Sequence, residues 1–363
     1  MKSNLITLFL LGFMLLTPVN AQFNLYSDYQ GIYDDNIFNN NQKVSDFINN
    51  FSFGAAYNFE SELNNVQLYY EGSMNSFREI SSKSFNTHRI GFVETYLFSE
   101  DTNPLNVGLN YSRRNNRDEF EVFNFEQISA YANYRHSVSE TDFILPGYIF
   151  NWNSYPNFTL FSHNEHKFFL TWSSSFQTKT SLSLNAELNY KQYLEQYDFE
   201  GYLNSASQLK FHINLGQSLG ENTGINGFAL IRKNLTDGSR YLVSDSLIYY
   251  EEEIFNDIYA YDGFEAGFGI RHYLTENIEL SLESKYSLRQ YSSLPAADIY
   301  GNELSSLRLD KLLGVGAGIS IDMNSIINGL SFYAAWNYFK NTSNDYYYKY
   351  TNQIISASLN YGF

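Results

Sequence analysis

Residues 278–289 read IELSLESKYSLR, with apolar and polar side chains in alternation. The mainly apolar positions are Ile278, Leu280, Leu282, Ser284, Tyr286 and Leu288. The polar positions between them are Glu279, Ser281, Glu283, Lys285, Ser287 and Arg289. Because successive side chains of a strand point to opposite faces, this segment predicts a β-strand with one apolar and one polar face.

The same alternation recurs along the chain, for example at residues 47–59, 66–75 and 182–191. No stretch beyond Phe23 shows sustained helical periodicity. The alternating segments run about 10 to 14 residues, whereas strands of soluble proteins usually run about 5 or 6 residues. Long strands with one apolar face favour a transmembrane β-barrel, in which one face meets lipid and the other meets water.

Short and longer connections alternate between these segments. The short ones fall near residues 60–65, 99–103, 139–142, 177–180, 216–223, 273–277 and 322–329. The longer ones fall near residues 34–44, 78–84, 115–123, 153–163, 194–204, 235–258, 292–306 and 341–347. Short periplasmic turns that alternate with longer outer loops are typical of outer-membrane barrels.

These breaks divide the chain into sixteen strands, an even number, as single-chain bacterial barrels require. The strands begin near Phe23, Asp46, Val66, Phe85, Leu105, Phe125, Phe143, Glu165, Ser181, Ser205, Gly224, Tyr259, Ile278, Leu307, Leu330 and Tyr348. The weakest are the first and the one from Phe143, because Pro146 removes a hydrogen-bond donor from its interior. We expect an all-β fold, a closed antiparallel transmembrane β-barrel of about 16 strands, with 14 strands as the alternative.

Composition excludes several other classes of protein. The 363 residues include no Cys, which excludes disulfides, a thiolate nucleophile and cysteine-based metal sites. A formal net charge of −16 argues against a nucleic-acid partner. Aromatic residues make up 18% of the chain, a content that disordered chains lack.

The N-terminal segment has the pattern of a secretory signal peptide. Lys2 precedes an apolar stretch at residues 5–16, which is shorter than the roughly 20 residues that a transmembrane helix needs. Small residues then precede an expected cleavage between Ala21 and Gln22. We expect residues 1–21 to be removed and residues 22–363 to form a single barrel domain, with an uncleaved N-terminal anchor as the alternative.

The end of the chain alternates up to a terminal aromatic residue, through Ile355, Ala357, Leu359, Tyr361 and Phe363. This ending resembles the β-signal of bacterial outer-membrane β-barrel proteins such as the porins. The resemblance implies that Leu359, Tyr361 and Phe363 present the last strand to the barrel assembly machinery. It also implies a place in the bacterial outer membrane, with outer-membrane lipid around the barrel.

Residues 33–38 read YDDNIF, which is similar to a stretch near the start of many uncharacterised outer-membrane barrels, some of them linked to surface polysaccharide. The plainer interpretation is a solvated turn in which an Asp or Asn side chain caps the backbone.

A barrel of about sixteen strands is too wide for its own side chains to fill and leaves an aqueous channel. If the polar positions face inward, nine basic and five acidic side chains line this channel. They are Glu71, Arg89, Arg135, Lys167, Glu187, Lys191, Lys210, Arg232, Glu265, Arg271, Glu279, Glu283, Lys285 and Arg289. The channel predicts a pore for passive diffusion of small hydrophilic solutes. The excess of basic groups predicts a mild preference of this pore for anions. In the alternative, opposite charges such as Glu283 and Arg271 pair across neighbouring strands and select nothing.

The connection at residues 235–258 is the longest and contains Glu251, Glu252 and Glu253. It either folds inward as a constriction or stays outside as an acidic surface. The second functional class is a non-conducting surface or assembly protein, whose loops bind a partner or polysaccharide. Because conventional porins are trimers, we expect a homotrimer.

The sequence offers no starting point for an enzyme, a cofactor or a metal site. It contains no G-x-S-x-G nucleophile motif and no G-x-x-x-x-G-K-[ST] phosphate loop. Among its six histidines only His163 and His166 lie close together. Residues three apart in a strand face opposite sides, so a metal shared with Glu165 would need a turn there. Asp34 and Asp35 suggest a catalytic role only through their adjacency.

Overall fold

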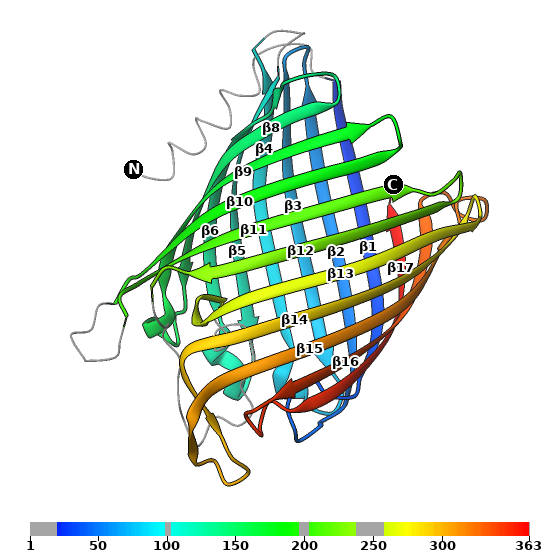
Figure 1. The fold of residues 1–363 in the computed structure, drawn as a ribbon. Coiled ribbons are helices and arrows are strands. Elements are labelled where there is room, and N and C mark those ends of the chain that lie inside the picture. Colours follow the sequence, from blue (N-terminus) through cyan, green and yellow to red (C-terminus); the bar gives the residue numbers. More distant parts are fainter. Residues whose placement is uncertain (1–19, 99–102, 196–202, 237–257, 363) are drawn as a thin grey trace, which may run out of the picture.

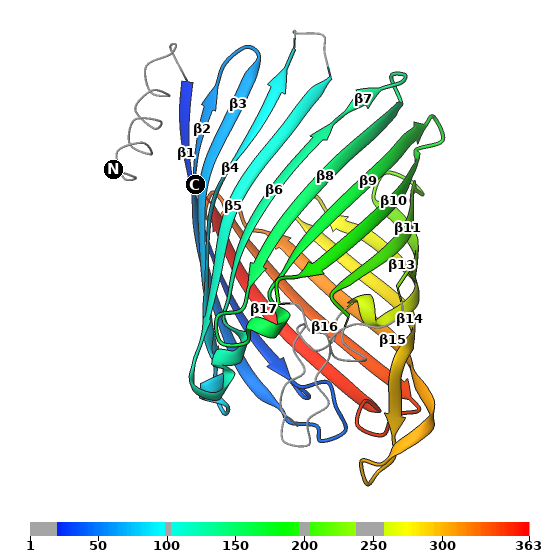
Figure 2. The same cartoon turned by 90° about the vertical axis from the view of Figure 1, so that its left-hand side faces the viewer.

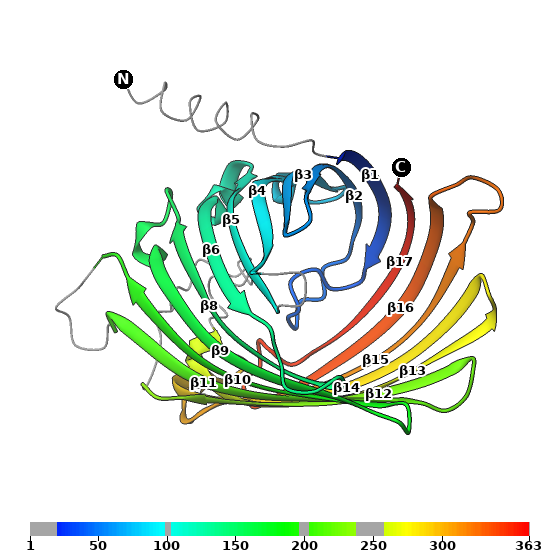
Figure 3. The same ribbon diagram turned by 90° about the horizontal axis from the view of Figure 1, so that it is seen from above.

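The computed structural model describes residues 20–98, 103–195, 203–236 and 258–362. Its strands form one antiparallel sheet that closes on itself, because β1 pairs with both β2 and β17 (Figure 1). Seen from above, the strands form a ring (Figure 3). The strands are β1 (Asn20–Asp34), β2 (Asp46–Glu60), β3 (Asn64–Phe77), β4 (Phe85–Leu97), β5 (Pro104–Asn116), β6 (Phe125–Tyr134), β7 (His136–Ser137), β8 (Asp142–Ser154), β9 (His163–Phe176), β10 (Thr180–Tyr193), β11 (Ser205–Ser218), β12 (Thr223–Asn234), β13 (Tyr261–Thr275), β14 (Ile278–Ala297), β15 (Glu303–Asp322), β16 (Leu330–Ser343) and β17 (Tyr350–Gly362).

Short 3-10 helices interrupt some of the connections. They are η1 (Ser81–Lys83), η2 (Asp118–Phe123), η3 (Thr159–Phe161) and η4 (Ile258–Ala260). No helix in the described ranges is long and apolar enough to cross a membrane.

The seventeen described strand segments make sixteen barrel strands, which confirms the expected number over the alternative of fourteen. β6 and β7 both pair with β8 and are one interrupted strand. The interruption faces Pro146, since Asn133 pairs with Gly147 and His136 pairs with Ile144. Proline has no backbone N–H to donate, so the ladder breaks on this side and continues on the other, where Pro146 lies opposite β9.

Strand starts follow the expected positions closely, and β2, β4, β6, β11, β14 and β16 begin at the expected residues. The largest difference is β15, which begins at Glu303 instead of Leu307. β14 and β15 extend beyond the neighbouring strands as a hairpin (Figure 2), so residues 292–306 are mostly strand and the expectation of a loop there was wrong. The register shifts on either side of Pro295, and this irregularity hides the extension from a search for alternation.

The pairing register assigns alternate residues of each strand to two faces of the sheet, which we call the polar face and the apolar face. Large apolar side chains on the apolar face stay exposed, including Phe23 at 59%, Ile90 at 59%, Leu282 at 57% and Ile355 at 54%. An exposed apolar band around a closed sheet is the lipid-facing surface of a transmembrane barrel. The polar face is therefore the inner one.

β1 begins and β17 ends at the end of the barrel that carries the short turns, and the longer connections lie at the opposite end (Figure 2). At that opposite end Phe38, Phe120 and Phe123 form a buried cluster. Nζ of Lys83 lies 5.3 to 5.5 Å from the ring centres of Phe38, Phe77 and Phe120. The connections that follow β1, β3 and β5 thus share a small core of their own.

Candidate functional site

The register puts thirteen of the fourteen residues expected at the lumen on the polar face, in β3, β4 and β9 to β14. The fourteenth, Arg135, lies in the interruption between β6 and β7, where its guanidinium carbon is 4.3 Å from the ring centre of Phe143. The fourteen residues are spread along the wall and do not gather into one site.

Several of these side chains pair across neighbouring strands. Nζ of Lys210 lies 3.1 Å from Oε2 of Glu187, and Nη1 of Arg89 lies 3.4 Å from Oε2 of Glu71. The hydroxyl of Tyr26 donates a second contact to Glu71, a hydrogen bond of 2.9 Å. Such contacts fit the interpretation in which the charges hold the wall together.

Glu265 of β13 joins charges from three neighbouring strands. Its carboxylate lies 4.0 Å from Nη2 of Arg232 in β12 and 3.2 Å from Nζ of Lys285 in β14. The side chains of Glu265 and Arg232 are mostly buried, at 15% and 10% exposure. The carboxylate therefore compensates both cations at once.

Arg271 pairs with Glu279, with 3.9 Å between Nε and Oε1. The expected example of a pair, Arg271 with Glu283, is not formed. Glu283 makes no ion pair or hydrogen bond with any residue in the described ranges.

Sequence reasoning missed Arg308 and Asp310 of β15, which form an ion pair with 2.6 Å between Nη2 and Oδ2. Both side chains are buried, and the guanidinium carbon of Arg308 lies 4.5 Å from the ring centre of Tyr291 and 3.0 Å from that of Tyr348. The alternation that begins at Leu307 marks both residues as polar positions, so this signal could have found them.

Further charged side chains hold polar-face positions in the described strands. They are Arg114 and Arg308 among the basic residues, and Asp28, Asp34, Asp46, Glu60, Glu165, Asp310 and Asp322 among the acidic ones. With these included, acidic and basic groups on the polar face are nearly equal in number. The basic excess of the fourteen expected residues alone is therefore offset.

The histidine pair does not converge on one site, because His163 and His166 lie on opposite faces of β9. Glu165 shares the polar face with His163. It accepts a 2.7 Å hydrogen bond from the hydroxyl of Tyr259 and lies 3.0 Å from Nζ of Lys167. Within the described part of the chain, no group of three His, Asp or Glu side chains is placed to hold a metal ion.

Residues 33–38 form the expected capped turn, in which Asn36 and Phe38 are buried and the other residues are half-buried or exposed. The backbone N–H of Asn36 donates to Oδ1 of Asp34 at 2.8 Å, and Asn36 itself is fully buried. Its amide donates to the carbonyl of Thr351, and Oδ1 of Asp35 accepts a 2.7 Å hydrogen bond from the backbone of Gln353. These hydrogen bonds tie the β1–β2 connection to β17 at the seam where the barrel closes.

Some expected features lie wholly or partly outside the described residues. These are the signal segment before Asn20, the terminal Phe363 and residues 237–257 of the longest connection. Leu359 and Tyr361 lie on the apolar face of β17, and Ala21 and Gln22 belong to the first residues of β1.

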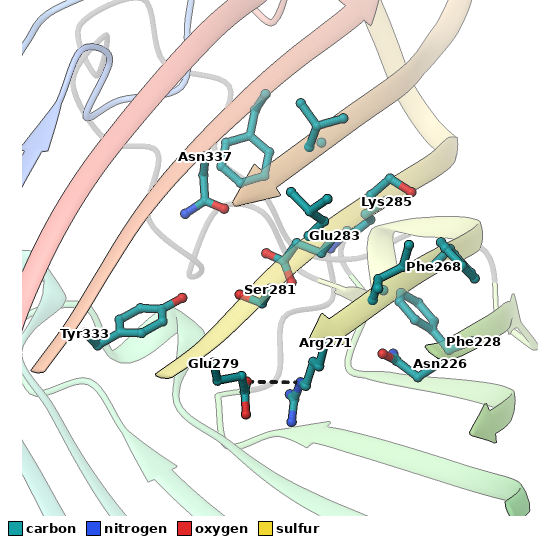
Figure 4. Close-up of a pocket in the computed structure, with 17 residues that line it drawn as sticks. Asn226, Phe228, Phe268, Arg271, Glu279, Ser281, Glu283, Lys285, Tyr333 and Asn337 are labelled. Carbon is teal, nitrogen blue, oxygen red and sulfur yellow. Dashed lines mark ion pairs between the residues drawn. The ribbon is translucent and has the colours of Figure 1, made fainter. Parts of the chain in front are cut away.

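A pocket of about 440 Å³ opens on the polar face across β12 to β16 (Figure 4). Glu279 and Arg271 form their ion pair at one side of it. Ser281 and Glu283 of β14 lie on the other side, toward Tyr333 and Asn337 of β16. The residues that line the pocket are Asn226, Phe228, Phe268, Gly269, Ile270, Arg271, Glu279, Ser281, Leu282, Glu283, Ser284, Lys285, Gly314, Val315, Tyr333, Asn337 and Phe339.

No protein-family model matches the chain, and no curated protein matches it either. Solved structures share its fold. The outer membrane protein OpdK from Pseudomonas aeruginosa is similar with a TM-score of 0.52 at 9% identity, over 94% of this chain and 99% of that chain. OpdL from the same organism gives a TM-score of 0.52 at 9% identity, over 95% and 99% of the two chains. OccAB2 from Acinetobacter baumannii gives 0.51 at 9% identity, over 95% and 98%.

The chain therefore has the fold of an outer-membrane β-barrel along nearly its whole length. This agrees with the resemblance in its C-terminal residues and with the apolar band on its outer face.

Proposed function

We propose that this protein is an outer-membrane pore for passive diffusion of small hydrophilic solutes. The observation that carries the proposal is the polar face that continues around the inside of a closed sheet of sixteen strands. Side chains on the wall of a barrel this wide do not fill its interior, and barrels of this size leave an aqueous channel. A water-filled channel passes solutes according to their size and charge.

The pore discriminates weakly between ions. Its charged residues are largely paired, as in the contacts of Glu265 with Arg232 and Lys285, and acidic and basic groups nearly balance. The mild anion preference expected from the fourteen residues is therefore reduced, and we expect anion and cation permeabilities of similar size.

The second candidate is a non-conducting surface or assembly protein that binds a partner or surface polysaccharide. The buried cluster of Phe38, Phe120 and Phe123 favours it, because the connections that form this cluster pack together at the end of the barrel that carries the longer connections (Figure 2). The two candidates differ in whether solutes cross the folded barrel.

Maturation and assembly complete the proposal. Cleavage between Ala21 and Gln22 would release the barrel domain, and Leu359, Tyr361 and Phe363 would present β17 to the assembly machinery. Three copies would associate, as in conventional porins. No enzymatic step belongs to this function.

Conductance of the purified, folded protein in planar bilayers tests the proposal, first in symmetric salt and then across a salt gradient. We expect discrete open channels with a reversal potential near zero. Liposome swelling in small sugars adds a direct measure of solute entry. A folded protein that gives neither conductance nor swelling would favour the non-conducting alternative.

A further inference from the structure

The pocket on the polar face of β12 to β16 holds polar side chains that have no partner in the protein. Ser281 and Glu283 of β14 and Tyr333 and Asn337 of β16 form no hydrogen bond or ion pair with any described residue. Glu283 and Tyr333 are exposed, so their polar atoms are accessible from the barrel interior.

Elsewhere on the polar face, comparable side chains bond one another across the strands. Asn106 donates a 3.0 Å hydrogen bond to Asn133, and Gln127 donates one of 2.8 Å to Asn153. These contacts are the ordinary way in which amides of a barrel wall satisfy each other. The unpartnered groups of the pocket depart from this pattern.

β15 runs between the two pairs of side chains and presents Gly316 between Glu283 and Asn337. A Cβ at Gly316 would lie 2.9 Å from Oε1 of Glu283 and closer still to Oδ1 of Asn337. The carboxylate and the amide thus approach each other over a position that only glycine leaves open.

Gly318 of β15 repeats this arrangement one step along the strand. A Cβ there would lie 2.7 Å from Oγ of Ser281 and 2.9 Å from the hydroxyl of Tyr333. Two glycines of β15 thus leave the space between the polar side chains of β14 and those of β16 open.

The charged neighbours of the pocket are already compensated. Arg271 lies 3.9 Å from Glu279, and Lys285 lies 3.2 Å from Glu265. Glu283 is thus the carboxylate that is left to bind a ligand, among neighbours whose charges cancel. Such a carboxylate favours a ligand that donates hydrogen bonds to it.

We infer that this pocket is a binding subsite for a neutral polyhydroxylated solute, such as a monosaccharide, on its passage through the barrel. Hydroxyl groups of the solute would donate to the carboxylate of Glu283 and accept from the amide of Asn337, while Ser281 and Tyr333 both donate and accept. The inference rests on the proposed pore function, because the solute must reach the barrel interior.

The test measures how glucose reduces single-channel conductance of the full mature protein. Polyethylene glycol of similar size serves as the reference, because it obstructs the channel without donating from ring hydroxyls. We expect glucose to reduce the conductance in a saturable way. The polymer should reduce it only in proportion to its concentration. Glu283→Gln keeps the shape of the side chain but removes its charge. It should raise the glucose concentration at half saturation about tenfold or more.

Gly316→Ala should abolish saturation, since its methyl group would displace Glu283 and Asn337 from each other. The matched control is Gly224→Ala, on the polar face of β12, where a Cβ would meet nothing nearer than a backbone oxygen at 4.0 Å. This control should behave as the unmodified protein does.

The outcomes separate the inference from the function on which it rests. Absence of any conductance in the folded, unmodified protein would overturn the pore. Open channels in which glucose and the polymer act alike would overturn the subsite and leave the pore standing. A small organic ammonium ion that reduces conductance at a lower half-saturating concentration than glucose would also overturn the inference. Glu283 would then act as a charge and not as a hydrogen-bond acceptor.

Discussion

The hydroxyl of Tyr26 in β1 donates a 2.9 Å hydrogen bond to Glu71 in β3, although β2 lies between the two strands. The contact passes over Gly54 of β2, where a Cβ would overlap the ring of Tyr26. Glu71 also lies 3.4 Å from Arg89 of β4. One glycine therefore allows a polar network to join four strands beside the seam of the barrel.

Replacing this glycine should loosen the network. Gly54→Ala forces the ring of Tyr26 away from Glu71, and overpacking of this kind costs about 1–3 kcal/mol. Urea unfolding of the protein in lipid or detergent measures the loss. Gly227→Ala is the control, because a Cβ there meets nothing nearer than a backbone oxygen at 3.6 Å. Equal stability of the two variants would contradict this role of Gly54.

Asp46 organises the connection between β3 and β4. Its carboxylate accepts hydrogen bonds of 2.7 to 3.0 Å from the backbone N–H groups of Phe47, Arg78, Glu79 and Ile80. Asp46→Ala leaves these donors without their acceptor and should destabilise this end of the barrel by about 3 kcal/mol.

Limited proteolysis of the β3–β4 connection checks this prediction. Asp46→Ala should be cleaved faster than the unmodified protein. Asp46→Asn keeps the oxygen that accepts three of the four hydrogen bonds and should lie between the two. Identical cleavage of all three proteins would show that the carboxylate does not hold the connection.

The buried pair of Arg308 and Asp310 should respond unequally to single and double replacement. Arg308→Met leaves a carboxylate buried at 3% exposure without its cation, which costs about 3–5 kcal/mol. Replacing Asp310 by Leu in the same protein should recover most of this loss, since apolar groups of similar volume often replace a buried ion pair at little cost. Urea midpoints of the three proteins supply the measurement. A double variant that is less stable than the single one would count against the pairing.

Glu265 should control the small charge preference of the channel. Glu265→Gln leaves Arg232 and Lys285 without their shared counter-charge. A unit charge about 7 Å away in water contributes ~0.6 kcal/mol, so anion permeability should rise and cation permeability should fall by about two- to threefold each. The reversal potential across a salt gradient reports the ratio of the two permeabilities. If it does not move toward anions, Glu265 does not act on the permeating ions.

Much of the barrel could be predicted because alternation is a local property of the sequence. Residues 278–289 show this directly, since their alternation placed them in a strand that begins at Ile278. The extension of β14 and β15 could not be predicted, because the register shift at Pro295 breaks the alternation just where the strands leave the regular barrel.

The candidate site, too, could be predicted only in part. Alternation assigned Glu283 to the polar face, but it could not say that Arg271 pairs with Glu279 and leaves Glu283 unpaired. That choice depends on the stagger between β13 and β14, which short turns and side-chain size set together. The role of the glycines of β15 could not be predicted, because it depends on which side chains lie across the sheet from them.

The central claim is that alternate residues of one strand meet water inside a conducting barrel and lipid outside it. The chain has no Cys, so a single cysteine can be placed at Asn185 or at its neighbour Leu184 in β10, which lie on the polar and apolar faces. A bulky, charged, water-soluble thiol reagent should react with Asn185→Cys in the folded protein and reduce its single-channel conductance, while Leu184→Cys stays unlabelled and conducts unchanged. Equal labelling of the two positions, or labelling of Asn185→Cys with no effect on conductance, would contradict the claim.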